Sequence, residues 1–418
     1  MKQGVIYFLL SFCVLISTIQ AQPGRYQQAI FSQKNVLTNI QYGSADSYDA
    51  LGLNIPLPQH LDVYEPLGDT ATKRPLVMVF FGGAFLIGDK SMQDVVAWCD
   101  SLTAYGYVCA AVNYRIGFNV LSSVSSIRAG YRGVQDARAA VRYMKEFHQQ
   151  FRIDTNLIFM VGNSAGTINA VQTAYASESD RPIETYGVAG TLDDNRDLGC
   201  LDCSGNSYQH TVDIAGVIGC WGAVIDLDGL DSSDSAPIIM FHGTDDTVVP
   251  IDSGAPFSNS ATFPTMYGSR QIHHKRTQLG LASELHVYQG EPHNFYYDVA
   301  LFPNNYWDTI WHLSHPFLCD INPYCNTVLS TNSIAETTTS VFEVHPNPAN
   351  TFINIEFLAP EKLEQKLLTV YTLLGQKMET YQVKDDQFYL DVREWERGVY
   401  LLKLEINNRE YVQKLIVE

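Results

Sequence analysis

The residues with the clearest capacity for chemistry form the pentapeptide from Gly162 to Gly166, with the sequence GNSAG, directly after the apolar run Leu157–Val161. This Gly-x-Ser-x-Gly pattern places a serine on a sharp turn from a strand to a helix, where the two glycines make room for the tightly bent backbone. The segment Thr167–Glu178 has neither proline nor glycine and predicts the required helix. Ser164 is therefore the candidate nucleophile; its alternative interpretation is a helix N-cap.

A serine hydroxyl becomes a good nucleophile when a base takes its proton and a carboxylate holds that base in one tautomer. His293 is the preferred base because its loop directly follows the predicted strand Glu284–Gln289. Asp246 is the preferred acid, since it ends a His-Gly-x-x-Asp pattern after the predicted strand Pro237–Phe241. Its neighbour Asp245 fits a turn or capping position better. Serine, acid and histidine thus occur in one of the known chain orders of such triads.

Other acids and histidines provide alternatives. Asp226 and Asp228, after the predicted strand Ile214–Gly219, are the reserve acids. His242 and His286 lie at or in predicted strands, so we interpret them as structural groups with satisfied hydrogen bonds.

A turn from Phe81 to Phe85, with the sequence FGGAF, follows the predicted strand that begins at Leu76. Such a turn can direct consecutive backbone N–H groups at the oxygen that becomes negative in a tetrahedral intermediate. We expect Gly83 and Ala84 to supply these donors, together with Ala165. The alternative is an ordinary glycine turn without a catalytic role.

The substrate pocket is less clearly marked. Trp221, just past a predicted strand end, is a candidate pocket residue together with Phe85 and Asn163, although a buried tryptophan is often plain core. The segments Arg181–Asp213 and Ser253–Ser269 lie between core elements and are expected to shape the pocket.

Between Gly24 and Tyr324, short apolar runs alternate with longer amphipathic segments, which is typical of a parallel sheet covered by helices on both faces. The runs predicted as strands are Leu76–Phe81, Val108–Val112, Leu157–Val161, Ile214–Gly219, Pro237–Phe241 and Leu285–Tyr288. The clearest helix is Arg128–Gln150, whose apolar positions recur at steps of three and four residues. This pattern leaves Arg138, Arg142 and Lys145 to solvent.

The chain begins with the features of a secretory signal peptide. Lys2 precedes an apolar stretch from Val5 to Ile19, and Ala21 ends a small-residue cleavage pattern. The stretch is too short for a typical membrane span, so no stable membrane span is expected.

A polar segment from Asn326 to Ser340 lacks helical or strand periodicity and predicts a linker. The segments Phe352–Phe357, Leu367–Leu373 and Val399–Ile406 beyond it are rich in β-formers, which predicts a small β-sandwich. The expected parts are a signal peptide (1–21), a catalytic domain (22–325), a linker (326–340) and a C-terminal sandwich (341–418).

Charge and cysteine content exclude some functions. The formal net charge of −18 provides no basic surface for nucleic acid. Close spacing predicts the disulfides Cys200–Cys203 and Cys319–Cys325, as expected in an oxidising compartment. The first pair has an alternative interpretation as a redox or zinc half-site, but no second half with matching spacing is found. We therefore expect neither a metal nor a cofactor.

Taken together, the segment from Leu61 to His293 resembles the α/β-hydrolase carboxylesterases. The FGGAF turn stands where the family has His-Gly-Gly-Gly-Phe, Val112–Arg115 follows the next strand, and Asp136–Arg142 precedes the serine turn. The resemblance implies an α/β-hydrolase fold and an oxyanion hole formed by Gly83, Ala84 and Ala165.

Two positions depart from the family pattern. Phe81 replaces a histidine and so loses the side-chain hydrogen bond that holds the loop, whereas Ala84 replaces the third glycine but keeps its N–H group. Neither change removes a catalytic group.

The C-terminal segment resembles the sorting domain of type IX secretion cargo. The similarity rests on Val344–Ala349 (VHPNPA), Leu374–Lys377 (LGQK) and Arg397–Leu402 (RGVYLL). It implies translocation across an outer membrane by the type IX secretion machinery and a final location outside the cell or on its surface. The alternative is an accessory carbohydrate-binding sandwich.

The predicted function is that of a secreted serine carboxylesterase. Acetyl or feruloyl esters of polysaccharides and aromatic polyesters are suitable substrates for an exported enzyme, and the sequence favours none of them. The alternatives are a catalytically silent surface binding protein with a hydrolase fold and a serine peptidase of the same fold.

Overall fold

The chain divides into two compact units, Met1–Leu329 and Ser330–Glu418. The computed structural model describes residues 24–48, 55–187, 196–260, 262–297, 302–325, 342–357, 366–372, 377–383, 387–393, 395–406 and 409–417. The predicted signal peptide and the predicted linker lie outside these residues.

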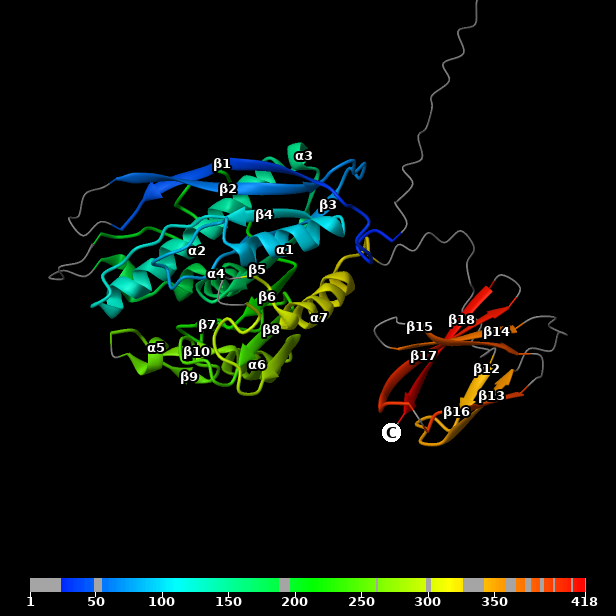
Figure 1. Cartoon of the computed structure of the whole chain (residues 1–418). Coiled ribbons are helices and arrows are strands. Elements are labelled where there is room, and N and C mark those ends of the chain that lie inside the picture. The colour runs from blue at the N-terminus through cyan, green and yellow to red at the C-terminus, as the bar shows by residue number, and fades with distance from the viewer. Residues whose placement is uncertain are drawn as a thin grey trace, which may run out of the picture. The chain divides into compact units, whose positions relative to one another are not determined.

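An eight-stranded sheet in the order β1-β2-β4-β3-β5-β6-β8-β11 forms the centre of the first unit (Figure 1). Its strands are β1 (Lys34–Asp46), β2 (Pro56–Pro66), β3 (Arg74–Phe80), β4 (Val108–Val112), β5 (Ile153–Asn163), β6 (Gly216–Cys220), β8 (Ile238–Gly243) and β11 (Ser283–Tyr288). The pairs β1-β2 and β2-β4 are antiparallel, whereas every pair from β4 to β11 is parallel. This confirms the mostly parallel sheet that the sequence predicts.

Most of the predicted strands of this sheet are buried on both faces; the exception is the edge strand β11, whose residues are half-buried or exposed. Every residue of β3, β4, β6 and β8 is buried, which explains their continuous apolar runs. The edge strand β1 is partly exposed along most of its length, and neither β1 nor β2 is predicted from the sequence. The apolar signal is weak where one face of a strand meets water.

Helices cover both faces of the sheet (Figure 1). They are α1 (Gln93–Ala104), α2 (Ser123–Glu146), α3 (His148–Phe151), α4 (Ala165–Tyr175), α5 (Pro256–Asn259), α6 (Ser269–Gln278) and α7 (Asn305–Ile321). On β6, a Cβ added to Gly216 would lie 2.9 Å from Ile321 of α7, and one added to Gly219 would lie 2.8 Å from Thr167 of α4. Positions three apart on a strand face opposite sides, so α4 and α7 lie on different faces. The arrangement is the α/β-hydrolase fold.

Short elements complete this unit near the ends of the parallel strands. They are η1 (Glu178–Asp180), η2 (Ile183–Tyr186) and a three-stranded sheet of β7 (Ala223–Val224), β10 (Met266–Gly268) and β9 (Ser253–Gly254).

The prediction that Arg142 and Lys145 of α2 face solvent is wrong. Both are buried, because the segment that contains the Cys200–Cys203 disulfide covers this side of the helix. Arg142 pairs with Asp202 at 2.6 Å, and Lys145 pairs with Asp213 at 3.0 Å. Helical periodicity reports the polarity of a face but not which acidic loop packs on it.

The cysteines of the first unit follow the predicted pattern. Cys200–Cys203 and Cys319–Cys325 are disulfides. The described free cysteines are Cys99, Cys109 and Cys220, all buried.

The second unit consists of two antiparallel sheets. One has the order β12-β13-β16 and the other β15-β14-β17-β18. The strands are β12 (Phe342–His345), β13 (Phe352–Phe357), β14 (Lys366–Thr372), β15 (Lys377–Val383), β16 (Gln387–Asp391), β17 (Gly398–Ile406) and β18 (Arg409–Val417). Ile355 of the first sheet and Leu368, Leu402 and Leu415 of the second are fully buried in one common core. This is the predicted small β-sandwich.

Candidate active site

Ser164 lies between the C-terminal end of β5 and the N-terminus of α4, on a backbone with φ of 54°. Positive φ is strained for a residue with a side chain, so the surrounding structure must hold it there. A Cβ added to Gly162 would lie 2.3 Å from the Gly166 carbonyl carbon, and one added to Gly166 would lie 2.1 Å from the Phe80 carbonyl oxygen. The two glycines therefore permit the backbone contacts that present Ser164.

His293 lies between Ser164 and Asp246. Its Nε2 is 3.0 Å from Ser164 Oγ, and its Nδ1 is 2.7 Å from Asp246 Oδ2. A proton on Nδ1 that is donated to the carboxylate leaves Nε2 as an acceptor for the serine hydroxyl. The three groups come from the loops after β5, β8 and β11, which end at the same edge of the parallel sheet.

The carboxylate of Asp246 has several further partners. Its Oδ1 accepts hydrogen bonds from the backbone N–H groups of Val248 and Val249 at 2.9 and 2.8 Å. His242 Nε2 lies 3.2 Å from Oδ2. Burial raises the pKa of Asp246, but the hydrogen bonds from His242 and His293 outweigh this and set it to about 2. The side chain is therefore ionised above strongly acidic pH, as an orienting carboxylate must be.

His242 has hydrogen-bond partners for both ring nitrogens, as expected of a structural histidine. The side chain is fully buried, with Nε2 2.9 Å from the Val249 carbonyl oxygen and Nδ1 2.8 Å from Ser269 Oγ. Because Nε2 faces two acceptors, it carries the proton, and His242 acts as a second donor to Asp246. This second contact is not predicted from the sequence, although the spacing of four residues between His242 and Asp246 could have suggested it.

The alternative acids lie elsewhere. Asp245 is exposed and accepts a hydrogen bond from its neighbour Thr244 at 3.1 Å. Asp226 is also exposed and accepts from the Asp228 backbone N–H at 2.8 Å, within its own turn. The structure places neither of these carboxylates on His293.

The FGGAF turn lies against the serine turn. A Cβ added to Gly82 would be 3.3 Å from Ser164 Cβ. Gly83 and Ala84 have φ of 121° and 55°, and in the described part of the chain their N–H groups donate no hydrogen bond. Ala165 begins α4, where backbone N–H groups have no partner within the helix. These N–H groups are therefore available to a ligand beside Ser164.

Tyr114 holds this turn where the family histidine is missing. Its ring stacks on Phe81 at 4.2 Å with an interplanar angle of 12°, and its hydroxyl donates to the Phe81 carbonyl oxygen at 2.8 Å. Further along, the Gly117 N–H donates to the Phe85 carbonyl oxygen at 2.6 Å. The turn thus gains a hydrogen bond from the following segment that Phe81 itself cannot make.

Asn163 lies behind Ser164, away from the predicted pocket. Its amide nitrogen donates to Asp94 at 2.7 Å, and its amide oxygen accepts from the Tyr296 hydroxyl at 2.6 Å. Burial raises the pKa of Asp94, against the hydrogen bond from Asn163. The side chain supports the serine turn from the interior and does not line the cavity described below.

Trp221 is also fully buried rather than pocket-lining. Its ring meets the His293 ring edge-on, with centroids 5.9 Å apart. The tryptophan therefore contacts the candidate base from the core side. This is the alternative given above, that Trp221 is a core residue.

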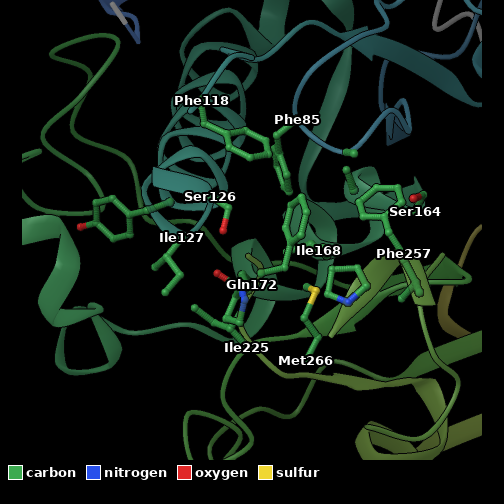
Figure 2. Close-up of a pocket in the computed structure, with 18 of the residues that line it drawn as sticks. Phe85, Phe118, Ser126, Ile127, Ser164, Ile168, Gln172, Ile225, Phe257 and Met266 are labelled. Carbon is green, nitrogen blue, oxygen red and sulfur yellow. The ribbon is translucent and has the colours of Figure 1, made fainter. Parts of the chain in front are cut away.

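An apolar cavity opens beside Ser164 (Figure 2). Phe85, a candidate pocket residue, lines this cavity, and so do the candidate oxyanion donors Ala84 and Ala165. The segment 253–269 contributes Pro256, Phe257, Phe263, Pro264 and Met266. From the other predicted segment, 181–213, only Pro182 among the described residues reaches the cavity. Residues that the sequence does not indicate are Phe118, Ser126, Ile127, Gly130, Tyr131, Ile168, Gln172, Ile225, Val248 and Val249.

Two features are absent from the described residues. No group of three or more histidine, cysteine, aspartate or glutamate side chains there has an arrangement that could hold a metal ion. No helix among them combines the length and the apolar character needed to cross a membrane.

Two protein families match separate parts of the chain. Residues 61–235 match the BD-FAE family, and residues 343–418 match the secretion system C-terminal sorting domain. The second match indicates type IX secretion to the cell surface or the extracellular space.

Several curated relatives that match over short segments are esterases, and a neuroligin-like protein of Caenorhabditis elegans also matches, at 29% identity over 135 residues. Carboxylesterase 3B of Mus musculus is 38% identical over 109 residues, which cover 25% of this chain and 18% of that protein. Gut esterase 1 of Caenorhabditis elegans is 26% identical over 181 residues, covering 43% and 30% of the two chains. The chain thus spans less than a third of the length of these relatives.

A solved structure, Thermogutta terrifontis esterase 2 phosphorylated by paraoxon, is 19% identical and covers 70% of this chain and 95% of that one, with a TM-score of 0.48. By the family and relative matches, the chain joins an α/β-hydrolase domain similar to esterases to a C-terminal domain similar to secretion sorting domains.

Proposed function

We propose that this protein is an exported serine carboxylesterase that works through an acyl-enzyme intermediate. The observation that carries the proposal is the hydrogen bonding of His293 on both sides, to Ser164 Oγ at 3.0 Å and to Asp246 at 2.7 Å. A hydroxyl, an imidazole and an ionised carboxylate in this contact can transfer a proton away from the hydroxyl as it attacks.

Each residue has a definite task in the proposed reaction. Ser164 Oγ attacks the ester carbonyl while His293 Nε2 takes its proton, and Asp246 stabilises the resulting imidazolium. The N–H groups of Gly83, Ala84 and Ala165 donate to the oxygen that becomes negative. His293 then returns the proton to the leaving alcohol, and a water molecule releases the acyl group by the same steps in reverse.

The apolar cavity supports a carboxylic ester as substrate. Four phenylalanines, Phe85, Phe118, Phe257 and Phe263, line it beside Ser164. Apolar walls favour an acyl group larger than acetyl, because burial of apolar surface contributes binding energy. Among the esters considered, feruloyl groups of polysaccharides and aromatic polyesters fit this lining better than acetyl groups do.

The decisive experiment compares the wild type with Ser164→Ala on a panel of acetyl, feruloyl, longer acyl and aromatic diester substrates. We expect the variant to lose at least about a thousandfold in kcat on every ester that the wild type hydrolyses. An unchanged rate in the variant would show that another group performs the chemistry. A wild type that hydrolyses no ester on the panel would favour the catalytically silent binding protein.

A further inference from the structure

Gln172 is a polar residue in the apolar cavity whose side chain has unused hydrogen-bonding capacity. Two other polar side chains that line the cavity are already paired: Ser126 donates to the Ser123 carbonyl oxygen at 2.7 Å and Tyr131 to the Gly199 carbonyl oxygen at 2.9 Å. Within the described residues, the half-buried Gln172 carboxamide makes no hydrogen bond. Its donors and acceptor are therefore available to a ligand.

The helix α4 sets the distance between Gln172 and the nucleophile. Ile168 and Gln172 follow Ser164 by four and eight residues, so the three lie on one face of the helix, and all three line the cavity. Eight residues correspond to about 12 Å along a helix axis. In Figure 2, Ser164 and Gln172 are well separated across the cavity. Helical side chains tend to lean towards the N-terminus of their helix, and Ser164 lies at that end of α4.

A second cavity adjoins the first at Gln172. Gln172, Ile127 and Ile225 line both, which makes the two cavities neighbours at this point. The second cavity is also lined by charged side chains, among them Asp226 and Glu184. Gln172 thus stands where the apolar surroundings end and polar ones begin.

The position of His293 indicates which half of an ester enters the apolar cavity. As general acid, His293 must face the oxygen of the leaving alcohol. Ser164 and the candidate oxyanion donors Ala84 and Ala165 line the cavity, whereas His293 does not. The alcohol therefore leaves on the other side of Ser164, and the acyl group occupies the cavity.

We infer that Gln172 is a specificity-determining residue that hydrogen-bonds the far end of the acyl group. The preferred acyl group is apolar next to its carbonyl and carries a hydroxyl or carbonyl group at its far end. An acetyl group is too short to reach Gln172. This inference rests on the proposed esterase function and adds to it the chemistry of the acyl group and the residue that recognises it.

The test uses two ethyl esters that differ only at the far end of the acyl group, 3-(4-hydroxyphenyl)propanoate and 3-(4-methylphenyl)propanoate. Hydroxyl and methyl are similar in size, so the ratio of their kcat/KM values reports the polar contact. Gln172→Met keeps the length of the side chain and removes its hydrogen bonds. We expect this variant to lower the hydroxyl-to-methyl ratio about fivefold relative to the wild type.

The ratio is insensitive to partial unfolding, because lost enzyme lowers both rates equally. Ser126→Ala is the matched control: it removes another polar group from the cavity, but one whose hydroxyl is already paired with Ser123, and should keep the wild-type ratio. A change of less than about twofold in Gln172→Met would overturn the inference, and so would an equal fall in Ser126→Ala.

Failure of this inference and failure of the proposed function give different results. If the chain is no esterase, the wild type hydrolyses neither ester and the panel tested with Ser164→Ala is also negative. If only the role of Gln172 is wrong, both esters are hydrolysed and the ratio is the same in wild type and Gln172→Met.

Discussion

The two sides of Ser164 differ in the side chains that surround it: polar and hydrogen-bonded on one side, mainly apolar on the other. Behind it, Asn163, Asp94 and Tyr296 form a buried hydrogen-bonded network, and His293 is bonded to Asp246. In front of it, the cavity is lined mainly by aromatic and aliphatic side chains. Hydrogen bonds are directional and fix atoms in place, whereas apolar contacts tolerate different shapes. Under the proposed function, the first side sets the reaction and the second sets the choice of substrate.

The largest effect expected from the hydrogen-bonded side follows Asp246→Asn. Asparagine keeps the shape of the side chain but loses the charge, and its amide N–H can donate a hydrogen bond to His293 Nδ1, which favours the tautomer with the proton on Nε2. We expect kcat to fall about 10⁴-fold on a substrate of the wild type, with a smaller change in KM. Steady-state kinetics of the two proteins provide the measurement.

The free energy of unfolding, measured at several pH values, distinguishes a catalytic role of the Asp246 carboxylate from a loss of structure in Asp246→Asn. The folded pKa of Asp246 is about 2, below its ordinary value of 3.8, so the ionised group stabilises the fold above about pH 4. This contribution is lost as the pH falls from about 4 to about 2, and Asp246→Asn lacks it throughout. The difference in unfolding free energy between the two proteins should therefore shrink on acidification. A constant difference, or a kcat loss below about tenfold, would contradict the role of the carboxylate.

A smaller effect is expected for Tyr114→Phe, which keeps the ring stacked on Phe81 and removes the hydrogen bond to its carbonyl oxygen. The FGGAF turn should then hold its N–H donors less accurately, because a main support is gone. We expect kcat to fall about tenfold with KM nearly unchanged, since the donors act on the transition state.

Tyr175→Phe is the matched control for this prediction. The Tyr175 hydroxyl also donates to a backbone carbonyl oxygen, that of Ala236, at 2.9 Å. Each variant should lower the free energy of unfolding by about 1 kcal/mol. Equal effects of the two variants on kcat would show that Tyr114 supports the fold rather than the reaction.

The smallest effect is expected for the double variant Cys200→Ser and Cys203→Ser. The disulfide closes a short loop, and such a loop contributes about 2 kcal/mol or less to stability. The loop is also held by Arg138 and Arg142, both paired with Asp202. Thermal unfolding should show a modest loss with ester turnover retained. Complete unfolding would mean that these ion pairs do not hold the loop.

Motifs at strand ends allowed Ser164, Asp246 and His293 to be chosen as candidates from the sequence, whereas the network of Asn163, Asp94 and Tyr296 was not predicted. The loops of Ser164 and Asp246 follow strands with buried apolar runs, and the loop of His293 follows the half-buried strand β11. Parallel strands bring such loops to one edge of the sheet. The fold class follows from the same apolar runs. The hydrogen bond from Tyr114 to Phe81 joins distant segments, which leave no local pattern in the sequence. His242 and Asp246 are close in sequence, but their spacing alone does not show that the two side chains face each other.

The cavity is much less predictable from sequence. Phe118, Gln172 and Met266 come from different segments of the chain and converge only on folding. Trp221 and Asn163 lie next to catalytic candidates in the chain or in space, yet both point into the interior. A side chain's direction at a strand end depends on the local twist and turn of the backbone, which residue type does not determine.

Covalent labelling with a fluorophosphonate, followed by peptide mass analysis, tests the central claim most directly. The account predicts that the wild type is modified at Ser164, that His293→Ala reacts far more slowly, and that Ser164→Ala is not modified at any residue. A wild type that stays unlabelled, or that is labelled at another residue, would contradict the account.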